Sequence, residues 1–134
     1  MSDPSKRFKK GMEIIERYSD KSDTPAYSIT FESLMDLDPA LEDYIVEFAF
    51  GDIYSREGLS DQQKTLLTIS SLVTQGLEPQ LRLHVNIGLT IGLTPKDIVD
   101  AIVHLLPYVG FPRVLNGLNI AKGVFTERKA DLRK

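Results

Sequence analysis

The sequence contains no cysteine, which excludes disulfides, thiolate metal sites and every mechanism that relies on a cysteine nucleophile or a thiol redox couple. Histidine is also scarce, because His84 and His104 are the only two in 134 residues. These two histidines are twenty residues apart, which is not a spacing of metal ligands on one element. We therefore predict no metal site.

Long apolar runs and basic stripes are missing as well. No run is long enough to span a bilayer, and the first residues, MSDPSKRFKKGM, lack the apolar centre of a signal peptide. We expect a cytoplasmic protein with no membrane partner. The formal net charge is −3, and residues 29–58 hold eight carboxylates against one base, Arg56. Because nucleic-acid binding needs a basic surface, we expect no nucleic-acid partner.

The chain does contain a series of amphipathic segments whose apolar residues recur at helical spacing. No segment shows the alternation of a strand, so the pattern predicts an all-α fold with six helices. The six predicted helices cover residues 6–19, 39–54, 60–75, 77–92, 95–106 and 112–126. A length of 134 residues suits a single domain, 1–134, with an N-terminal helix and arm over 1–38 and a core over 39–126. Residues 28–37 form a short apolar patch that is either a helical turn or two or a docked arm.

Residues 77–92, LEPQLRLHVNIGLTIG, form a segment that is apolar on nearly all sides, which is typical of a buried helix. Pro79 suits its first turn, and Gly92 can end it in the left-handed conformation. His84 lies in the middle and is a candidate general acid or base, because an imidazole titrates near neutral pH. The alternative is a buried histidine bonded to a carbonyl group. The same two interpretations apply to His104.

Arginines are the candidates for binding an anionic substrate, because the guanidinium fork matches a carboxylate. These candidates are Arg56, Arg82 and Arg113. Arg113 and Asn116 follow Pro112 in the segment PYVGFPRVLNGL, at a predicted helix start where backbone N–H groups favour an anion. The alternative is that these arginines are solvated and that the segment only packs two helices together.

Two long segments, FGDIYSREGLSDQQKTLLTISSLVTQG and LRLHVNIGLTIGLTPKDIVDAIVHLLPYVGFPRVLNGLNIAKGVF, resemble the carboxymuconolactone decarboxylase family. This family belongs to the all-helical alkyl hydroperoxidase D-like superfamily, and the resemblance runs from about Pro39 to Phe125. The redox branch of the superfamily carries C-x-x-C-x3-H-x7-G with an upstream glutamate. His84 and Gly92 keep the second half of this motif. Leu77 and Gln80 stand where the cysteines would be and the glutamate falls near Thr65, so thiol peroxidase activity is not expected.

The resemblance implies a carboxy-lyase that removes CO2 from γ-carboxymuconolactone in the β-ketoadipate route of aromatic catabolism, without a cofactor. In that chemistry His84 would supply a proton, and Arg113, Arg56, Arg82 and Asn116 would bind the small anionic substrate. Family members form rings of subunits, so we expect a homo-oligomer, a trimer or hexamer, with contacts through 66–73 and 77–91. The alternative is a paralogue with a different activity, or none, on another lactone or carbonyl ligand.

Overall fold

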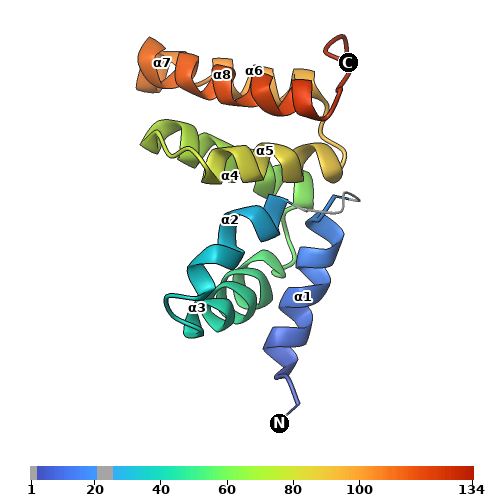
Figure 1. Ribbon diagram of the computed structural model, residues 1–134. Helices are drawn as coiled ribbons and strands as arrows, with labels where there is room; N and C mark the ends of the chain where they lie inside the picture. Colours follow the sequence, from blue (N-terminus) through green and yellow to red (C-terminus); the bar gives the residue numbers. More distant parts are fainter. Residues whose placement is uncertain (1–2, 21–25) are drawn as a thin grey trace. The chain divides into compact units, whose positions relative to one another are not determined.

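The computed structural model describes residues 3–20 and 26–134 of the chain. All regular structure within these ranges is helical, which confirms the all-α prediction (Figure 1). The chain groups into two compact units, residues 1–60 and 61–134. The expectation of a single domain stays a prediction. Among the described residues no helix combines the length and apolarity needed to cross a membrane.

The helices described in the first unit are α1 (Lys6–Tyr18), α2 (Ala26–Met35), α3 (Ala40–Asp43) and η1 (Tyr44–Tyr54). The apolar patch whose type the sequence left open therefore falls largely in α2. The next helix begins at Ala40, one residue after the predicted start, and Asp38 Oδ1 accepts a hydrogen bond of 3.0 Å from the Ala40 N–H. This hydrogen bond satisfies the Ala40 N–H, a backbone donor that has no partner inside the helix.

The element η1 is a π-helix, whereas the sequence predicted an ordinary α-helix throughout 39–54. A π-helix closes i to i+5 hydrogen bonds, so each of its turns holds more residues than a turn of an α-helix. Apolar residues spaced by four fit this period as well as the α-helical one, so the pattern could not distinguish them. In the wider turn Val46, Phe50 and Gly51 are buried. Tyr44 and Phe48 are exposed.

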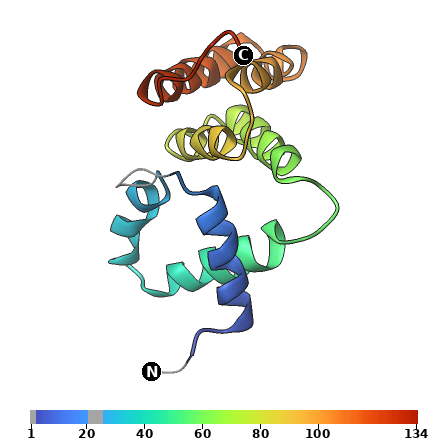
Figure 2. The ribbon, with the colours of Figure 1, turned by 90° about the vertical axis from the view of Figure 1, so that its right-hand side faces the viewer.

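Two glycines bring α1 and η1 close together, and Figure 2 shows the two helices crossing. A Cβ atom on Gly11 would overlap the carbonyl oxygen of Val46, and one on Gly51 would overlap that of Arg7. No larger residue fits either position without separating the helices. Aromatic rings add to the same contact, because Tyr18 of α1 packs edge-on against Phe50 and Tyr54 of η1, with ring centroids 6.4 and 5.8 Å apart.

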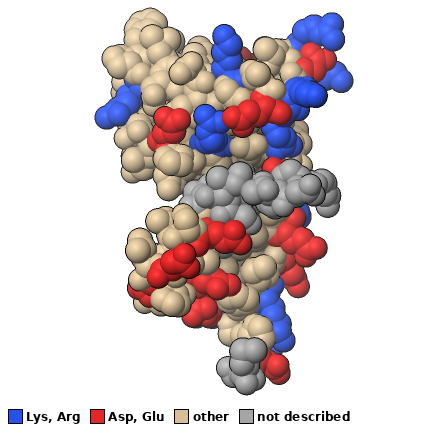
Figure 3. All heavy atoms as spheres, in the orientation of Figure 1, with Lys and Arg blue, Asp and Glu red and all other residues tan. Residues whose placement is uncertain are grey.

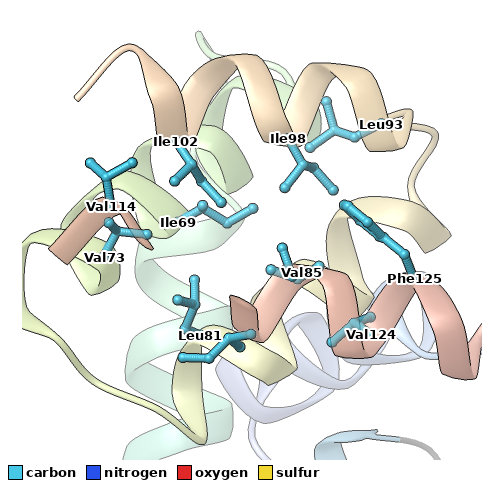
Figure 4. Close-up of a cluster of buried hydrophobic side chains, with 12 residues drawn as sticks. Ile69, Val73, Leu81, Val85, Leu93, Ile98, Ile102, Val114, Val124 and Phe125 are labelled. Atoms are coloured by element: carbon cyan, nitrogen blue, oxygen red, sulfur yellow. The ribbon is translucent and has the colours of Figure 1, made fainter. Parts of the chain in front are cut away.

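The second unit contains α4 (Asp61–Gln75), α5 (Gln80–Thr90), α6 (Pro95–Val103), α7 (Leu106–Val109) and α8 (Phe111–Glu127). Figure 1 shows α4 and α5 in one layer and α6 and α8 in the other. Apolar side chains from these four helices meet between the layers (Figure 4). The core residues labelled there are Ile69, Val73, Leu81, Val85, Leu93, Ile98, Ile102, Val114, Val124 and Phe125.

The ends of the helices follow the local signals in the sequence. Thr94 and Asp97 form a reciprocal capping box at the start of α6, with Pro95 in its first turn. Gly76 and Gly92 follow α4 and α5 with φ angles of 72° and 103°, in the left-handed region that favours glycine. The six predicted helices are thus present, with α3 and η1 together in place of the second. The structure adds the helices α2 and α7.

Two glycines of α8 allow a matched test of this packing. A Cβ on Gly117 would lie 2.9 Å from Val73 Cγ2, in a buried position where a β-branched side chain has little freedom to move. A Cβ on Gly123 would meet only the flexible Arg82 guanidinium, at 3.6 Å. We expect Gly117→Ala to destabilise the fold by about 1–3 kcal/mol. Gly123→Ala should instead stabilise it by about 0.5–1 kcal/mol, through helix propensity.

Urea unfolding of both variants, followed by circular dichroism, measures these two free energies. Because the exchanges are identical and lie on one helix, propensity alone would raise the stability of both. Equal stabilisation by the two alanines would show that the contact between α8 and α4 is looser than described.

Candidate active site

His84 lies in the middle of α5, a helix whose residues before and after it are largely buried. Leu81 and Val85, on either side of it in sequence, are fully buried in the core of the second unit. His84 itself is half-buried, and its Nδ1 atom is shielded from solvent. The imidazole therefore stands at the boundary between the packed interior and the surface, as a residue that meets a substrate would.

Burial lowers the pKa of His84 from 6.5 to about 4. The cause is desolvation, because an imidazolium ion loses its favourable hydration when the ring leaves water. At neutral pH the side chain is consequently a neutral imidazole, with one nitrogen that donates and one that accepts a hydrogen bond. In the free protein it can act as a base or as a neutral donor.

Thr65, near which the redox branch would place its glutamate, is 1% exposed in α4. Its hydroxyl donates a 2.9 Å hydrogen bond to the carbonyl oxygen of Asp61. Its methyl carbon lies 3.5 Å from the position of a Cβ on Gly88, one helical turn after His84 on α5. This part of α4 presents an apolar methyl group to α5 instead of a carboxylate.

Arg82 is held by carboxylates of its own chain. Its Nη1 lies 2.9 Å from Glu127 Oε1 on α8, and its Nη2 lies 3.9 Å from Glu78 Oε1. Gly123 leaves room for the guanidinium beside α8. Two acidic groups thus occupy the fork that was predicted to bind substrate.

Arg113 and Asn116 are both exposed in the first turns of α8. The Arg113 guanidinium lies over Gly76, where a Cβ atom would overlap its Nη1. This places the cation beside the carboxyl end of α4, which favours positive charge. No carboxylate among the described residues pairs with Arg113. Gly123, beside which Arg82 lies, is ten residues further along α8, or roughly 15 Å of helix, so the two arginines are held at different ends.

Arg56 belongs to the first unit, where it lines a groove at the end of η1. The other predicted site residues belong to the second unit. His104 is exposed and lies beside the ring of Tyr108, with centroids 5.9 Å apart. Arg113 and Asn116 thus lie three residues apart on α8, and Arg82 forms an ion pair. Arg56 lines a groove of the first unit.

Arg128, which follows α8, was missed by reasoning from the sequence. Its Nη1 donates to the carbonyl oxygen of Asn86 at 3.2 Å and to Thr90 Oγ1 at 3.2 Å. These bonds tie the end of α8 to the second half of α5 and so help to fix the helix that carries His84. A polar arginine in a charged tail gives no local signal of such a contact.

The chain matches the model of the Carboxymuconolactone decarboxylase family over residues 39–123. It is 30% identical over 122 residues to the 4-carboxymuconolactone decarboxylase of Acinetobacter baylyi, covering 90% of this chain and 88% of that protein. It is 36% identical over 91 residues to an uncharacterized 15.0 kDa protein of Paracoccus denitrificans, covering 66% and 68%. A nitrosuccinic acid decarboxylase of Metarhizium robertsii is 28% identical over 81 residues, covering 60% and 57%.

The lowered pKa of His84 predicts how stability depends on pH. Between pH 6.5 and about 4 the unfolded chain binds a proton at this histidine that the folded chain does not bind. The contribution of His84 to the free energy of unfolding is therefore fully present above pH 6.5. It falls as the pH drops, by roughly 2 kcal/mol between pH 7 and pH 5. Unfolding in urea at the two pH values, for the wild type and for His84→Gln, isolates the contribution of this one side chain.

His104→Gln is the matched control, because it removes the exposed histidine of the same unit and keeps His84. Proton NMR of the imidazole signals tests the pKa directly, with each signal assigned by the variant that lacks it. A His84 signal that titrates near pH 6.5 would mean that the ring is solvated and that no such slope exists.

Proposed function

The chain belongs to the carboxymuconolactone decarboxylase family, and we propose that it is a carboxy-lyase that decarboxylates a carboxylated lactone without a cofactor. The observation that carries this proposal is the similarity to a 4-carboxymuconolactone decarboxylase along 90% of the chain. The half-buried, neutral His84 on the central helix supports it, since such a group is suited to proton transfer. We propose, from the same resemblance, that the reaction belongs to aromatic catabolism.

The reaction breaks the bond between the ring carbon and the carboxylate, which leaves as CO2. The electron pair passes through the unsaturated lactone to its carbonyl oxygen, so that the substrate acts as its own electron sink. A proton then adds to the carbon and completes the product. The protein needs a donor facing the developing enolate oxygen and a group that delivers the proton.

His84 can serve both needs in sequence. As a neutral imidazole it donates an N–H hydrogen bond to the enolate oxygen without first having to be protonated. A bound substrate carboxylate beside the ring raises the pKa of the imidazole, because an opposite charge favours the protonated form. Binding of the anion thus favours the imidazolium form of His84, which can donate a proton to the carbon. In the free protein His84 is protonated only at low pH.

Arg113 is the arginine that we propose as the anchor of the retained carboxylate. No described carboxylate pairs with it, whereas Glu127 and Glu78 occupy Arg82. Asn116 lies three residues further along α8 and is also exposed, so the two side chains share one face of the helix. A guanidinium and an amide can together bind both oxygens of a carboxylate.

The nitrosuccinic acid decarboxylase among the relatives supports the wider reaction class. Nitrosuccinic acid, like carboxymuconolactone, carries an electron-withdrawing group that can accept the pair released by loss of CO2. We place the carboxylated lactone first, because its decarboxylase covers 90% of this chain against 60%.

We expect His84→Ala to lower kcat about a hundredfold or more with a smaller change in KM, because proton transfer acts in the transition state. Arg113→Ala should act mainly by raising KM, since it removes an attraction that is present before and during the reaction. The assay follows the lactone absorbance and the release of CO2 from carboxymuconolactone, with nitrosuccinate as a second substrate.

His104→Ala is the control for the histidine, and Lys122→Ala, an exposed cation of α8, is the control for the arginine. Full activity of His84→Ala on a confirmed substrate would remove His84 from the mechanism. Turnover of nitrosuccinate alone would keep the reaction class and replace the lactone as substrate.

We also propose that the protein is a homo-oligomer, a trimer or hexamer. Support comes from large apolar side chains at the start of α8 and before it, where Tyr108 is 75% and Phe111 66% exposed. Leu67 of α4, within the predicted contact segment 66–73, is also exposed. The part assigned to 77–91 stays a prediction, since most apolar residues of α5 are already buried.

Phe111→Asp should therefore shift the protein to smaller species, because a carboxylate cannot be buried at an apolar contact without large cost. Light scattering coupled to gel filtration at micromolar concentration measures the mass. Leu132→Asp, which changes another exposed apolar residue far along the chain, should leave the mass unchanged. A monomeric wild-type protein would contradict the assembly.

A further inference from the structure

The first unit contains a groove of about 660 Å³ that the proposed mechanism does not use. It lies between the first turns of α1 and the segment at the end of η1. All of its lining residues come from this unit: Lys6, Arg7, Lys10, Gly51, Asp52, Ser55, Arg56 and Glu57. Its volume is that of a typical small-molecule site.

Arg7 gives the groove a fixed wall. Its Nε lies 3.0 Å from Asp52 Oδ1 and its Nη2 2.8 Å from Asp52 Oδ2, a bidentate pair. Its Nη1 donates a third bond of 3.1 Å to Glu47 Oε2. Hydrogen bonds from Arg7 hold the pKa of Asp52 below its usual range, so that this carboxylate stays ionised and paired. The acidic groups near Arg7 are thus engaged by it.

The groove as a whole carries a net positive charge. Four cationic side chains and two carboxylates line it, a net charge of two positive in a chain whose formal net charge is −3. Lys6 and Lys10 are four residues apart on α1, a spacing at which like charges face each other and repel. Figure 3 shows blue atoms near the start of α1, whereas most charged atoms elsewhere on this unit are red.

We propose that this groove binds a small organic polyanion, a metabolite with two or more phosphate or carboxylate groups. Such a ligand would relieve the repulsion between Lys6 and Lys10 and could also reach the guanidinium of Arg56. One anionic group would engage only part of this set, so several groups on one molecule fit better. A nucleic acid fits less well, because residues 29–58, which include Arg56, hold eight carboxylates.

The groove is open, so binding must depend strongly on salt, as expected for exposed charges. The test is a titration of the full-length protein by ¹⁵N NMR and calorimetry at low ionic strength, with tripolyphosphate and citrate as probes. Acetate at matched ionic strength is the monoanion control. We expect saturable shifts at residues 6–10 and 51–57 with the polyanions, and none with acetate. The stronger of the two probes identifies phosphate or carboxylate as the preferred group.

Lys10→Glu and Lys9→Glu form a matched pair of variants. Both residues are exposed on α1 and both exchanges alter the net charge equally, but only Lys10 lines the groove. We expect Lys10→Glu to weaken polyanion binding about tenfold or more, because it reverses a charge at the ligand. Lys9→Glu should weaken it less than about threefold, through the general field alone.

Circular dichroism checks that both variants fold as the wild type does. Equal losses in the two variants would show that the anion responds only to net charge, and absence of saturable wild-type binding at millimolar probe would also overturn the site. The titration needs no turnover, so its outcome is independent of the proposed lyase activity.

Discussion

The burial of α5 in the apolar core of the second unit is the constraint on which the candidate chemistry depends. Leu81 and Val85 are fully buried there, and the helix that they fix also carries His84 out of bulk water. The same packing that stabilises the fold therefore opposes protonation of the imidazole. Arg128 adds polar restraints to the other half of the helix, through Asn86 and Thr90. The position and the charge state of His84 thus have one physical origin.

A neutral histidine changes how the reaction can be organised. We predicted from the sequence that His84 donates a proton, yet with a pKa of about 4 little imidazolium exists at neutral pH. In the proposed reaction, the carboxylate of an anionic substrate would favour the protonated ring and so remove this conflict. Proton delivery is then coupled to binding. This coupling suits a reaction in which the substrate itself holds the electron pair and needs only a hydrogen bond and a proton.

Local signals in the sequence predicted much of the fold, because caps and glycine turns involve residues close in the chain. Gly92, which follows α5 with a φ angle of 103°, is one such case. The π-helical form of η1 was not predictable, since a spacing of four residues fits both helical periods. The partners of the arginines were also hidden. Arg82 and Glu127 are 45 residues apart, and no local pattern records an ion pair formed only by folding.

What an arginine can do in this protein is decided by the acids that folding places beside it. Arg7, between Asp52 and Glu47, serves as a structural wall, and Arg82 is engaged in the same way by Glu127 and Glu78. Arg113 lies over Gly76, the glycine that ends α4, so its positive charge is close to the negative end of that helix. No carboxylate of the described residues pairs with it. A substrate carboxylate need not displace an acid of the protein to reach it. By this criterion Arg113 is better suited than Arg82 to bind an anion, although both carry the same charge.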